Sequence, residues 1–305
     1  MDKQDFLSIE DIEPKVLTEL LDAADDAKKK PKSVGSALKG KQVALIFEKP
    51  STRTRVSFEV AVESMGGHAL VLRSDELQLG RGETIEDTGR VLSGYVDAIV
   101  VRTFEHDRLL RLAASSSVPV VNSLSDYSHP CQALADYQTV RERKGKLEGL
   151  SLGYIGDGNN VAHSLMFGGA KLGLNVRIAT PPGHEPQTSV TERCEQIAAG
   201  TGGTVTVTNV VAEAAAGADV LYTDVWASMG QEAEADKRRN IFEKYSISPA
   251  ELDLAADDVI VMHCLPAHRG EEIAAEVIDG PHSVVWDQAE NRLHTQKALL
   301  AWLLS

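Results

Sequence analysis

Cysteine is scarce in this chain. Only Cys131, Cys194 and Cys264 occur among 305 residues. Three scattered thiols cannot form a disulfide framework, and no two of them have the spacing of a zinc knuckle. We therefore expect neither a disulfide-stapled fold nor a structural zinc site, and we expect a reducing, cytoplasmic environment.

Positive charge is also in short supply. The 31 Lys and Arg residues face 45 Asp and Glu, which gives a formal net charge of −14. This balance argues against a broad basic surface for nucleic acid or for an anionic membrane, so any basic site must be a local cluster. The acidic excess fits a high-salt habitat and also fits an ordinary mesophilic cytosolic protein.

Long apolar runs are missing as well. No stretch approaches the 18 or more apolar residues of a membrane span, and the start, Met1 to Asp5, has neither the cationic beginning nor the apolar core of a signal peptide. With 43% hydrophobic and 25% charged residues, the composition is that of an ordinary globular protein. We expect a soluble chain with no membrane partner.

What the chain does contain is an alternation of short β-branched runs with longer amphipathic stretches, a pattern typical of parallel strands joined by helical crossovers. At roughly 150 residues per domain, the length predicts two domains. We predict an α/β fold of two doubly wound parallel-sheet domains with a C-terminal helix packing back on the first. The strands are expected at 43–47, 69–72, 98–101, 118–121, 152–155, 176–179, 205–207, 220–222 and 259–262.

The boundaries between the parts follow from composition. The polar, glycine-containing segment 143–149 predicts the junction, which gives domains at 1–145 and 146–285 and a returning helix at 286–305. A helical stretch from Gln132 to Lys144 is expected to link the halves. The charged segment 231–239 is interpreted as a solvated helix face.

The strongest chemical signal follows the first strand. Ser51-Thr52-Arg53-Thr54-Arg55 begins a helix at a strand's carboxyl end. Free backbone N–H groups and a partial positive charge at a helix N-terminus already favour an anion, and this segment adds three hydroxyls and two guanidiniums. The combination suits a phosphate. The alternative is a capped helix with exposed arginines.

Two further strand ends in the first half offer donors. Arg102 follows the third strand, and His129-Pro130-Cys131-Gln132 follows the strand expected to end at Val121. A histidine and an amide that begin a helix can donate to a carbonyl oxygen, as an oxyanion stabiliser does. Taken separately, Arg102 can also be a surface residue and His129 a helix cap. Their joint placement beside the phosphate motif favours a site.

The second half contains two loops that invite misreading. Gly156 to Asn160 does not fit the G-x-G-x-x-G dinucleotide fingerprint, and no acidic residue follows the next strand to bind a ribose. Cys264 stands beside His263, but neighbouring strand residues point to opposite faces, so we reject a covalent cysteine mechanism.

Together, Ser51-Thr52-Arg53-Thr54-Arg55 and His129-Pro130-x-Gln132 resemble the carbamoyl phosphate signature of the aspartate and ornithine carbamoyltransferases, and the resemblance runs along essentially the whole chain. It implies that Ser51, Thr52, Arg53 and Thr54 bind the phosphate and that Arg102, His129 and Gln132 hold the carbamoyl group. It also assigns Arg292 to this site. From sequence alone, Arg292 could instead be a surface arginine preceding the last helix.

The loops Asp224-Val225-Trp226-Ala227-Ser228-Met229-Gly230 and His263-Cys264-Leu265-Pro266 resemble the ornithine branch of that family. The resemblance implies that Asn160 contacts the amino acid's carboxylate, that Asp224, Ser228 and Met229 bind ornithine, and that Cys264 and Leu265 lie near the attacking δ-amine. For Asn160, an Asn-Gly turn capping a helix is the alternative. An acidic acceptor would be repelled, whereas Asp224 and Ser228 can accept from an α-ammonium.

The resemblance carries expectations about assembly too. The segment 74–83 is similar to a loop that reaches a neighbouring subunit's site, with Gln78 as the contact, and Arg81-Gly82 stands where common bacterial members have His-Lys. A homotrimer or a higher multiple of trimers is implied, with trimer and dodecamer both open.

The expected reaction is transfer of the carbamoyl group of carbamoyl phosphate to the δ-amine of L-ornithine, giving L-citrulline and phosphate in arginine metabolism, with Arg53, Arg102, His129 and Cys264 as the catalytic residues. Neither a cofactor nor a metal is expected, and domain closure is expected to exclude water. The alternatives are a transferase for putrescine or an acylated ornithine, an inactive binding paralogue, and a dehydrogenase.

Overall fold

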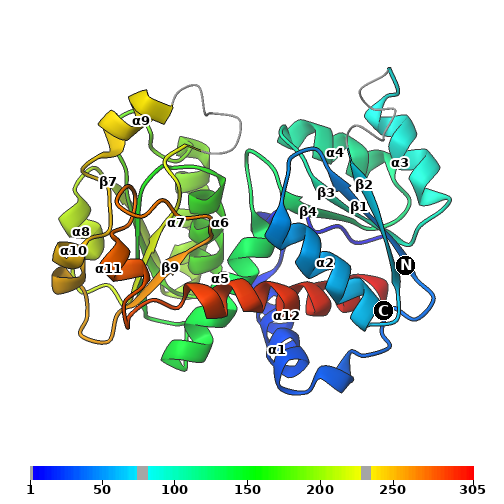
Figure 1. Ribbon diagram of the computed structural model, residues 1–305, viewed down its shortest axis with the longest axis horizontal. Helices are drawn as coiled ribbons and strands as arrows, with labels where there is room; N and C mark the ends of the chain where they lie inside the picture. The colour runs from blue at the N-terminus through cyan, green and yellow to red at the C-terminus, as the bar shows by residue number, and fades with distance from the viewer. Residues whose placement is uncertain (1–2, 74–81, 228–234) are drawn as a thin grey trace. The chain divides into compact units, whose positions relative to one another are not determined.

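The computed structural model of the chain describes residues 3–73, 82–227 and 235–305 (Figure 1). It divides into two compact units. The first comprises the residues up to Gln138 together with Glu290–Ser305, and the second comprises Thr139–Ala289. Both divisions fall inside helices rather than in loops. The domain boundaries drawn from the sequence stay predictions.

The first unit is built on a four-stranded parallel sheet of order β2-β1-β3-β4. Its inner strands β1 and β3 are almost entirely buried, as expected for β-branched runs covered on both faces. The strands are β1 (Gln42–Phe47), β2 (His68–Arg73), β3 (Ala98–Arg102) and β4 (Val120–Leu124).

The fourth strand differs from its prediction. The run 118–121 was expected, but pairing with β3 begins only at Val120 and continues to Leu124. Pro119 has no N–H for the ladder, and a register shift beside Arg102 carries the pairing further along the chain. Arg102 itself is the last residue of β3 rather than the residue after it.

Helices cover both faces of this sheet. Figure 1 shows α3 and α4 on one side and α2 and α12 on the other. The apolar faces of α3 and α4 form one core cluster with β1 and β3. The helices are α1 (Pro14–Lys29), α2 (Thr52–Ser64), α3 (Ile85–Ser93), α4 (His106–Ser115), α5 (Pro130–Lys144) and α12 (Val285–Leu304), with 3-10 turns at Ile9–Asp11 and Pro31–Ser33.

The second unit is built on a five-stranded parallel sheet of order β7-β6-β5-β8-β9. Its strands are β5 (Ser151–Ile155), β6 (Asn175–Ala179), β7 (Thr204–Thr208), β8 (Val220–Thr223) and β9 (Ile260–His263). Its helices are α6 (Asn160–Lys171), α7 (Thr188–Thr201), α8 (Val211–Ala215), α9 (Ala235–Phe242), α10 (Pro249–Leu254) and α11 (Ala275–Ile278).

The prediction of two doubly wound sheets is therefore confirmed. The C-terminal helix does pack on the first unit, where Lys28 Nζ donates to Asn291 Oδ1 at 2.7 Å. Within the described ranges, no helix is long and apolar enough to cross a membrane.

The strand orders also say where ligands should bind. In each sheet the chain first builds outward on one side and then on the other, which puts switch points between β1 and β3 and between β5 and β8. Open α/β sheets bind ligands in the crevice at the carboxyl ends of such strands. The phosphate motif follows β1 and Arg102 ends β3, while Asn160 and Asp224 follow β5 and β8.

Candidate active site

The phosphate motif forms the start of α2. Ser51 is the N-cap residue in extended conformation, with φ −160°, yet its hydroxyl caps no backbone N–H. The capping alternative therefore does not account for this hydroxyl. Thr54 is buried, Ser51 and Arg53 are half-buried and Thr52 is exposed. Main-chain donors, hydroxyls and one arginine thus lie at one helix end, as an anion site requires.

Arg292 joins this motif from the C-terminal helix. It lies inside α12 and is only 3% exposed, so the alternative of a surface arginine preceding the last helix is wrong. Its Nη2 donates to Thr54 Oγ1 at 3.2 Å, and its Nη1 donates to Gln132 Oε1 at 2.5 Å. Three residues that are far apart in the chain therefore meet in the first unit.

The other two donors are buried as well. Arg102 is 5% exposed and His129, directly before α5, is 6% exposed, so neither is a surface residue. Burial lowers the pKa of His129 well below its usual value, and the positive charges of Arg292, Arg102 and Arg53 lower it further. A neutral His129 keeps one N–H to donate among three guanidiniums.

Cys131, within the same segment, has no comparable chemistry. It is fully buried, its Sγ donates to the Asn122 carbonyl at 3.3 Å, and burial raises the pKa of its thiol to about 12. It is a packed, protonated side chain.

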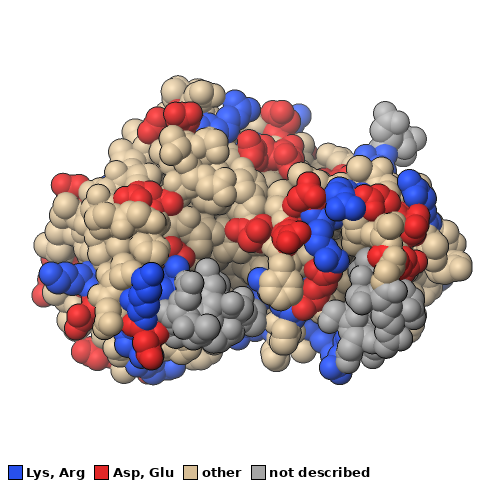
Figure 2. All heavy atoms as spheres, turned by 90° about the horizontal axis from the view of Figure 1, so that it is seen from above, with Lys and Arg blue, Asp and Glu red and all other residues tan. Residues whose placement is uncertain are grey.

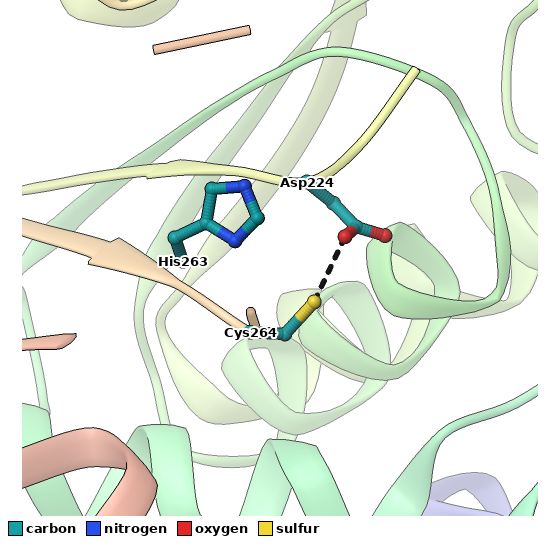
Figure 3. Close-up of side chains that lie close together, drawn as sticks. All are labelled: Asp224, His263 and Cys264. Carbon is teal, nitrogen blue, oxygen red and sulfur yellow. Dashed lines mark hydrogen bonds between the residues drawn. The ribbon is translucent and has the colours of Figure 1, made fainter. Parts of the chain in front are cut away.

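In the second unit, Asp224 is the centre of the site. It follows β8, is 5% exposed and accepts at both oxygens. Cys264 Sγ donates to its Oδ1 at 2.8 Å, as Figure 3 shows, and Asn159 Nδ2 donates to its Oδ2 at 3.1 Å. Cys264 thus acts as a thiol donor toward a carboxylate.

The neighbouring residues Asn159 and Asn160 have different positions at the start of α6. Asn159 is the N-cap of α6, and its Oδ1 accepts from the backbone N–H groups of Val161 and Ala162. Asn160, the predicted contact, is half-buried at the first helical position, whereas the hydrogen bond from Asn159 to Asp224 was not predicted. The chain at Pro186 passes so close to Gly158 that a Cβ there would lie 2.2 Å from the Pro186 nitrogen. The loop before Asn159 therefore needs a glycine at this position.

His263 holds the loop that carries Cys264 and Leu265. Its Nδ1 accepts from the Leu265 N–H at 2.9 Å, so its Nε2 carries the proton and donates to Glu272 Oε1 at 2.9 Å. Both side chains are fully buried. Leu265 adopts φ 58°, a left-handed conformation that costs free energy in a non-glycine residue and needs such support. Glu272 was not anticipated from the sequence.

The interpretation of 231–239 as a solvated face is wrong at Arg238. This residue of α9 is 7% exposed, and its guanidinium donates to the Asp157 carboxylate and to the Trp226 carbonyl. Its guanidinium carbon lies 5.1 Å from the centre of the Phe242 ring. It therefore ties together the loops after β5 and β8. Its neighbour Arg239 is the solvated one, with half its side chain exposed.

Three predicted contacts, Gln78, Ser228 and Met229, lie outside the described residues. Within those ranges, two groups place potential metal ligands within 4.8 Å of one another: Asp224, His263 and Cys264, and His268, Glu271 and Glu272. In the first group, the hydrogen bond from the Cys264 thiol to Asp224 and the two hydrogen bonds of His263 explain why these side chains lie close together.

Comparisons with known proteins agree along the whole chain. Residues 4–142 match the family described as aspartate/ornithine carbamoyltransferase, carbamoyl-P binding domain, and residues 148–303 match its Asp/Orn binding domain. An ornithine carbamoyltransferase of Parafrankia sp. is 58% identical over 307 residues, covering 100% of this chain and 97% of the relative. One of Pyrococcus abyssi is 55% identical, covering 99% and 96%.

A solved structure supports the same relationship. The ornithine carbamoyltransferase from Pyrococcus furiosus superposes with a TM-score of 0.95 at 54% sequence identity, covering 98% of this chain and 96% of that one.

Proposed function

Because the chain belongs to the aspartate/ornithine carbamoyltransferase family, we propose that it transfers the carbamoyl group of carbamoyl phosphate to the δ-amine of L-ornithine. The products are L-citrulline and phosphate. The observation that carries this proposal is the full-length identity of 55–58% to relatives named for that activity. The donor and acceptor sites below are its structural counterpart.

Carbamoyl phosphate binds in the first unit. Its phosphate is held at the start of α2 by Ser51, Thr52, Arg53 and Thr54, where free backbone N–H groups and the helix dipole favour a dianion. Arg102, His129, Arg292 and Gln132 surround the carbamoyl group. Burial of these groups supports the assignment, since each keeps its charge or dipole in a low-dielectric setting where it acts strongly on a developing oxyanion.

Ornithine binds in the second unit. Asp224 offers a buried carboxylate to an ammonium group, and Asn160 at the start of α6 offers donors to the α-carboxylate. Cys264 and Leu265 are held in place by Asp224 and His263, beside the expected position of the δ-amine. Ser228, Met229 and Gln78 are assigned to the substrate site because of the sequence resemblance to the ornithine carbamoyltransferases.

The chemistry is a substitution at the carbonyl carbon. The unprotonated δ-amine attacks this carbon, an oxyanion develops, the C–O bond to phosphate breaks, and the proton lost by the amine passes to the departing phosphate. Donors around the carbonyl stabilise the oxyanion, and the loss of one such donor typically costs about 10²–10³ in rate. The δ-amine of ornithine has a pKa of ~10, so it must lose its proton before or after it enters the site.

Assembly and location belong to the same proposal. We expect a homotrimer or a multiple of trimers in the cytoplasm, with small molecules rather than nucleic acid or membrane as partners. On the face drawn in Figure 2, Lys and Arg lie interspersed with Asp and Glu instead of gathering into a basic patch, which supports that expectation.

The test compares two arginines in the first turn of one helix. Arg53→Ala removes a phosphate ligand, whereas Arg55→Ala removes an exposed side chain that pairs with Glu59 at 3.6 Å. Citrulline formation is measured with ornithine, and carbamoylation of putrescine and aspartate is measured in parallel. We expect ornithine to be preferred and Arg53→Ala to lose at least about 10² in kcat/KM. Wild-type kinetics in Arg53→Ala would refute the phosphate site.

A further inference from the structure

The amide of Gln132 is held on both sides by buried charged groups of the first unit. Its Nε2 donates to Asp136 Oδ1 at 2.8 Å, and its Oε1 accepts from Arg292 Nη1 at 2.5 Å. All three side chains are 3% exposed or less. Gln132 and Asp136 are four residues apart on α5, so they lie on the same helix face.

These two partners leave the amide one orientation. A guanidinium has only hydrogens to offer, so it must meet the amide oxygen, and a carboxylate has only lone pairs, so it must meet the amide nitrogen. A rotation of the amide by 180° would set N–H against N–H at Arg292 and oxygen against oxygen at Asp136. Gln132 therefore presents an oxygen, with one lone pair still available, on the side of Arg292 and Thr54.

The groups near this oxygen are mainly hydrogen-bond donors, whereas the oxygen is an acceptor. Arg53, Arg102 and Arg292 are close enough to depress the pKa of His129, and these groups supply hydrogen-bond donors. A carbamoyl group needs donors at its carbonyl oxygen, but its NH₂ needs an acceptor. The Gln132 oxygen is such an acceptor.

We propose that Asp136 is a positioning residue that orients the Gln132 amide and thereby makes the donor site select a carbamoyl group over an acetyl group. This inference rests on the proposed function. Acetyl phosphate has the same phosphate and carbonyl but carries a methyl group where carbamoyl phosphate carries NH₂, and a methyl leaves the buried amide oxygen without its second hydrogen bond. Asp136 is itself buried, and its effect on the substrate passes through the Gln132 amide that it holds.

The decisive variant is Asp136→Asn, which keeps the shape of the side chain. An asparagine offers both an oxygen and an NH₂, so it holds the Gln132 Nε2 less strictly than a carboxylate does, and Arg292 becomes the only partner that requires the amide oxygen. The readout is the ratio of the inhibition constant of acetyl phosphate, competing with carbamoyl phosphate, to the KM of carbamoyl phosphate. We expect this ratio to fall by up to about tenfold, the effect of about one buried hydrogen bond, with the KM for ornithine unchanged.

A matched control uses a second glutamine of α5, whose carboxylate partner lies on α1. Gln138 Nε2 donates to Asp25 Oδ1 at 3.2 Å, so Asp25→Asn disturbs a second glutamine–carboxylate bond outside the proposed site, and its ratio should equal that of the unmodified chain. Gln132→Ala should lower the ratio by itself, and adding Asp136→Asn to it should lower the ratio no further. If Asp136→Asn fails to fold, Asp136→Ser, which removes the carboxylate and leaves room for water, takes its place.

Two results overturn the role of Asp136 while leaving the transfer intact. One is an unchanged ratio, or equal weakening of both ligands, in the Asp136 variant of an enzyme that makes citrulline. The other is a further fall of the ratio in the double variant, because the effect would then bypass Gln132. An unmodified chain that makes no citrulline would instead refute the proposed function, and the inference with it.

Discussion

Replacing Arg238 with methionine should destabilise the second unit more than its position in a charged helix suggests. The side chain of Arg238 is only 9% exposed. Its guanidinium donates to the carboxylate of Asp157, whose side chain is 14% exposed, and to the Trp226 carbonyl. Methionine keeps the stem that packs near Phe242 but leaves a buried carboxylate and a carbonyl without this donor.

The size of the loss follows from those two groups. Breaking a buried ion pair by removing one partner costs about 3–5 kcal/mol, and an unsatisfied buried acceptor costs about 1–3 kcal/mol. His184 Nδ1 remains 3.6 Å from Asp157 Oδ1 and offsets part of this loss. We therefore expect a loss of about 3–5 kcal/mol in the free energy of unfolding at pH 8.

The loss should depend on pH. Burial raises the pKa of Asp157, and Arg238 opposes that rise, so the variant's Asp157 should have a still higher pKa. A carboxyl whose folded pKa exceeds its unfolded value binds more protons when folded. Its protein then loses stability as the pH rises from the unfolded to the folded pKa, by at most about 1.4 kcal/mol per pH unit, and no further above it. The difference in the free energy of unfolding between the Arg238→Met variant and the unmodified protein should therefore be smaller at pH 5 than at pH 8.

Urea denaturation at both pH values, followed by tryptophan fluorescence, measures this gap, because Trp226 is buried beside Phe242. Arg239→Met is the control: its side chain is 51% exposed, so solvent screens its ion pairs and their loss should change the stability little. Adding Asp157→Asn to the Arg238 variant should restore part of the stability at pH 8. Equal losses for Arg238→Met and Arg239→Met at both pH values would refute the reasoning.

Two further outcomes follow from the same structure. In the native protein, Ellman's reagent should react first with half-buried Cys264, because Cys131 and Cys194 are buried and the pKa of Cys131 is about 12; a Cys264→Ala variant that keeps the fast reaction would contradict this. In rate profiles, kcat/KM for ornithine should rise toward alkaline pH as the δ-ammonium loses its proton, while the KM of carbamoyl phosphate should show no step near pH 6.5, since the pKa of His129 lies far below it. A step there would mean that His129 titrates.

Much of the fold was predictable because a parallel strand that is buried on both faces can be identified from the local sequence, as a short β-branched run. The phosphate motif was predictable for a related reason, since Ser51 to Thr54 stand together at one helix start. The failures have physical causes. The shift of β4 depends on pairing with β3, and no local pattern near Arg292 reports that its side chain is buried against Thr54.

The residues that the sequence analysis missed are those that act through others. Glu272 supports His263, Asn159 reaches Asp224, and Arg238 bridges two loops. Each is a polar residue whose partner lies 9 to 81 positions away, and by itself each resembles a surface side chain. Only the packed structure distinguishes a buried partner from a solvated one.

The placement of Arg292 has a consequence for biosynthesis. The first unit receives this residue from the last helix, at a position that the ribosome reaches only after the entire second unit, residues 139–289, has been made. A nascent chain stopped before that point carries the α2 phosphate motif but lacks the guanidinium that Thr54 and Gln132 meet. The donor pocket, although encoded early in the message, becomes chemically complete late in translation.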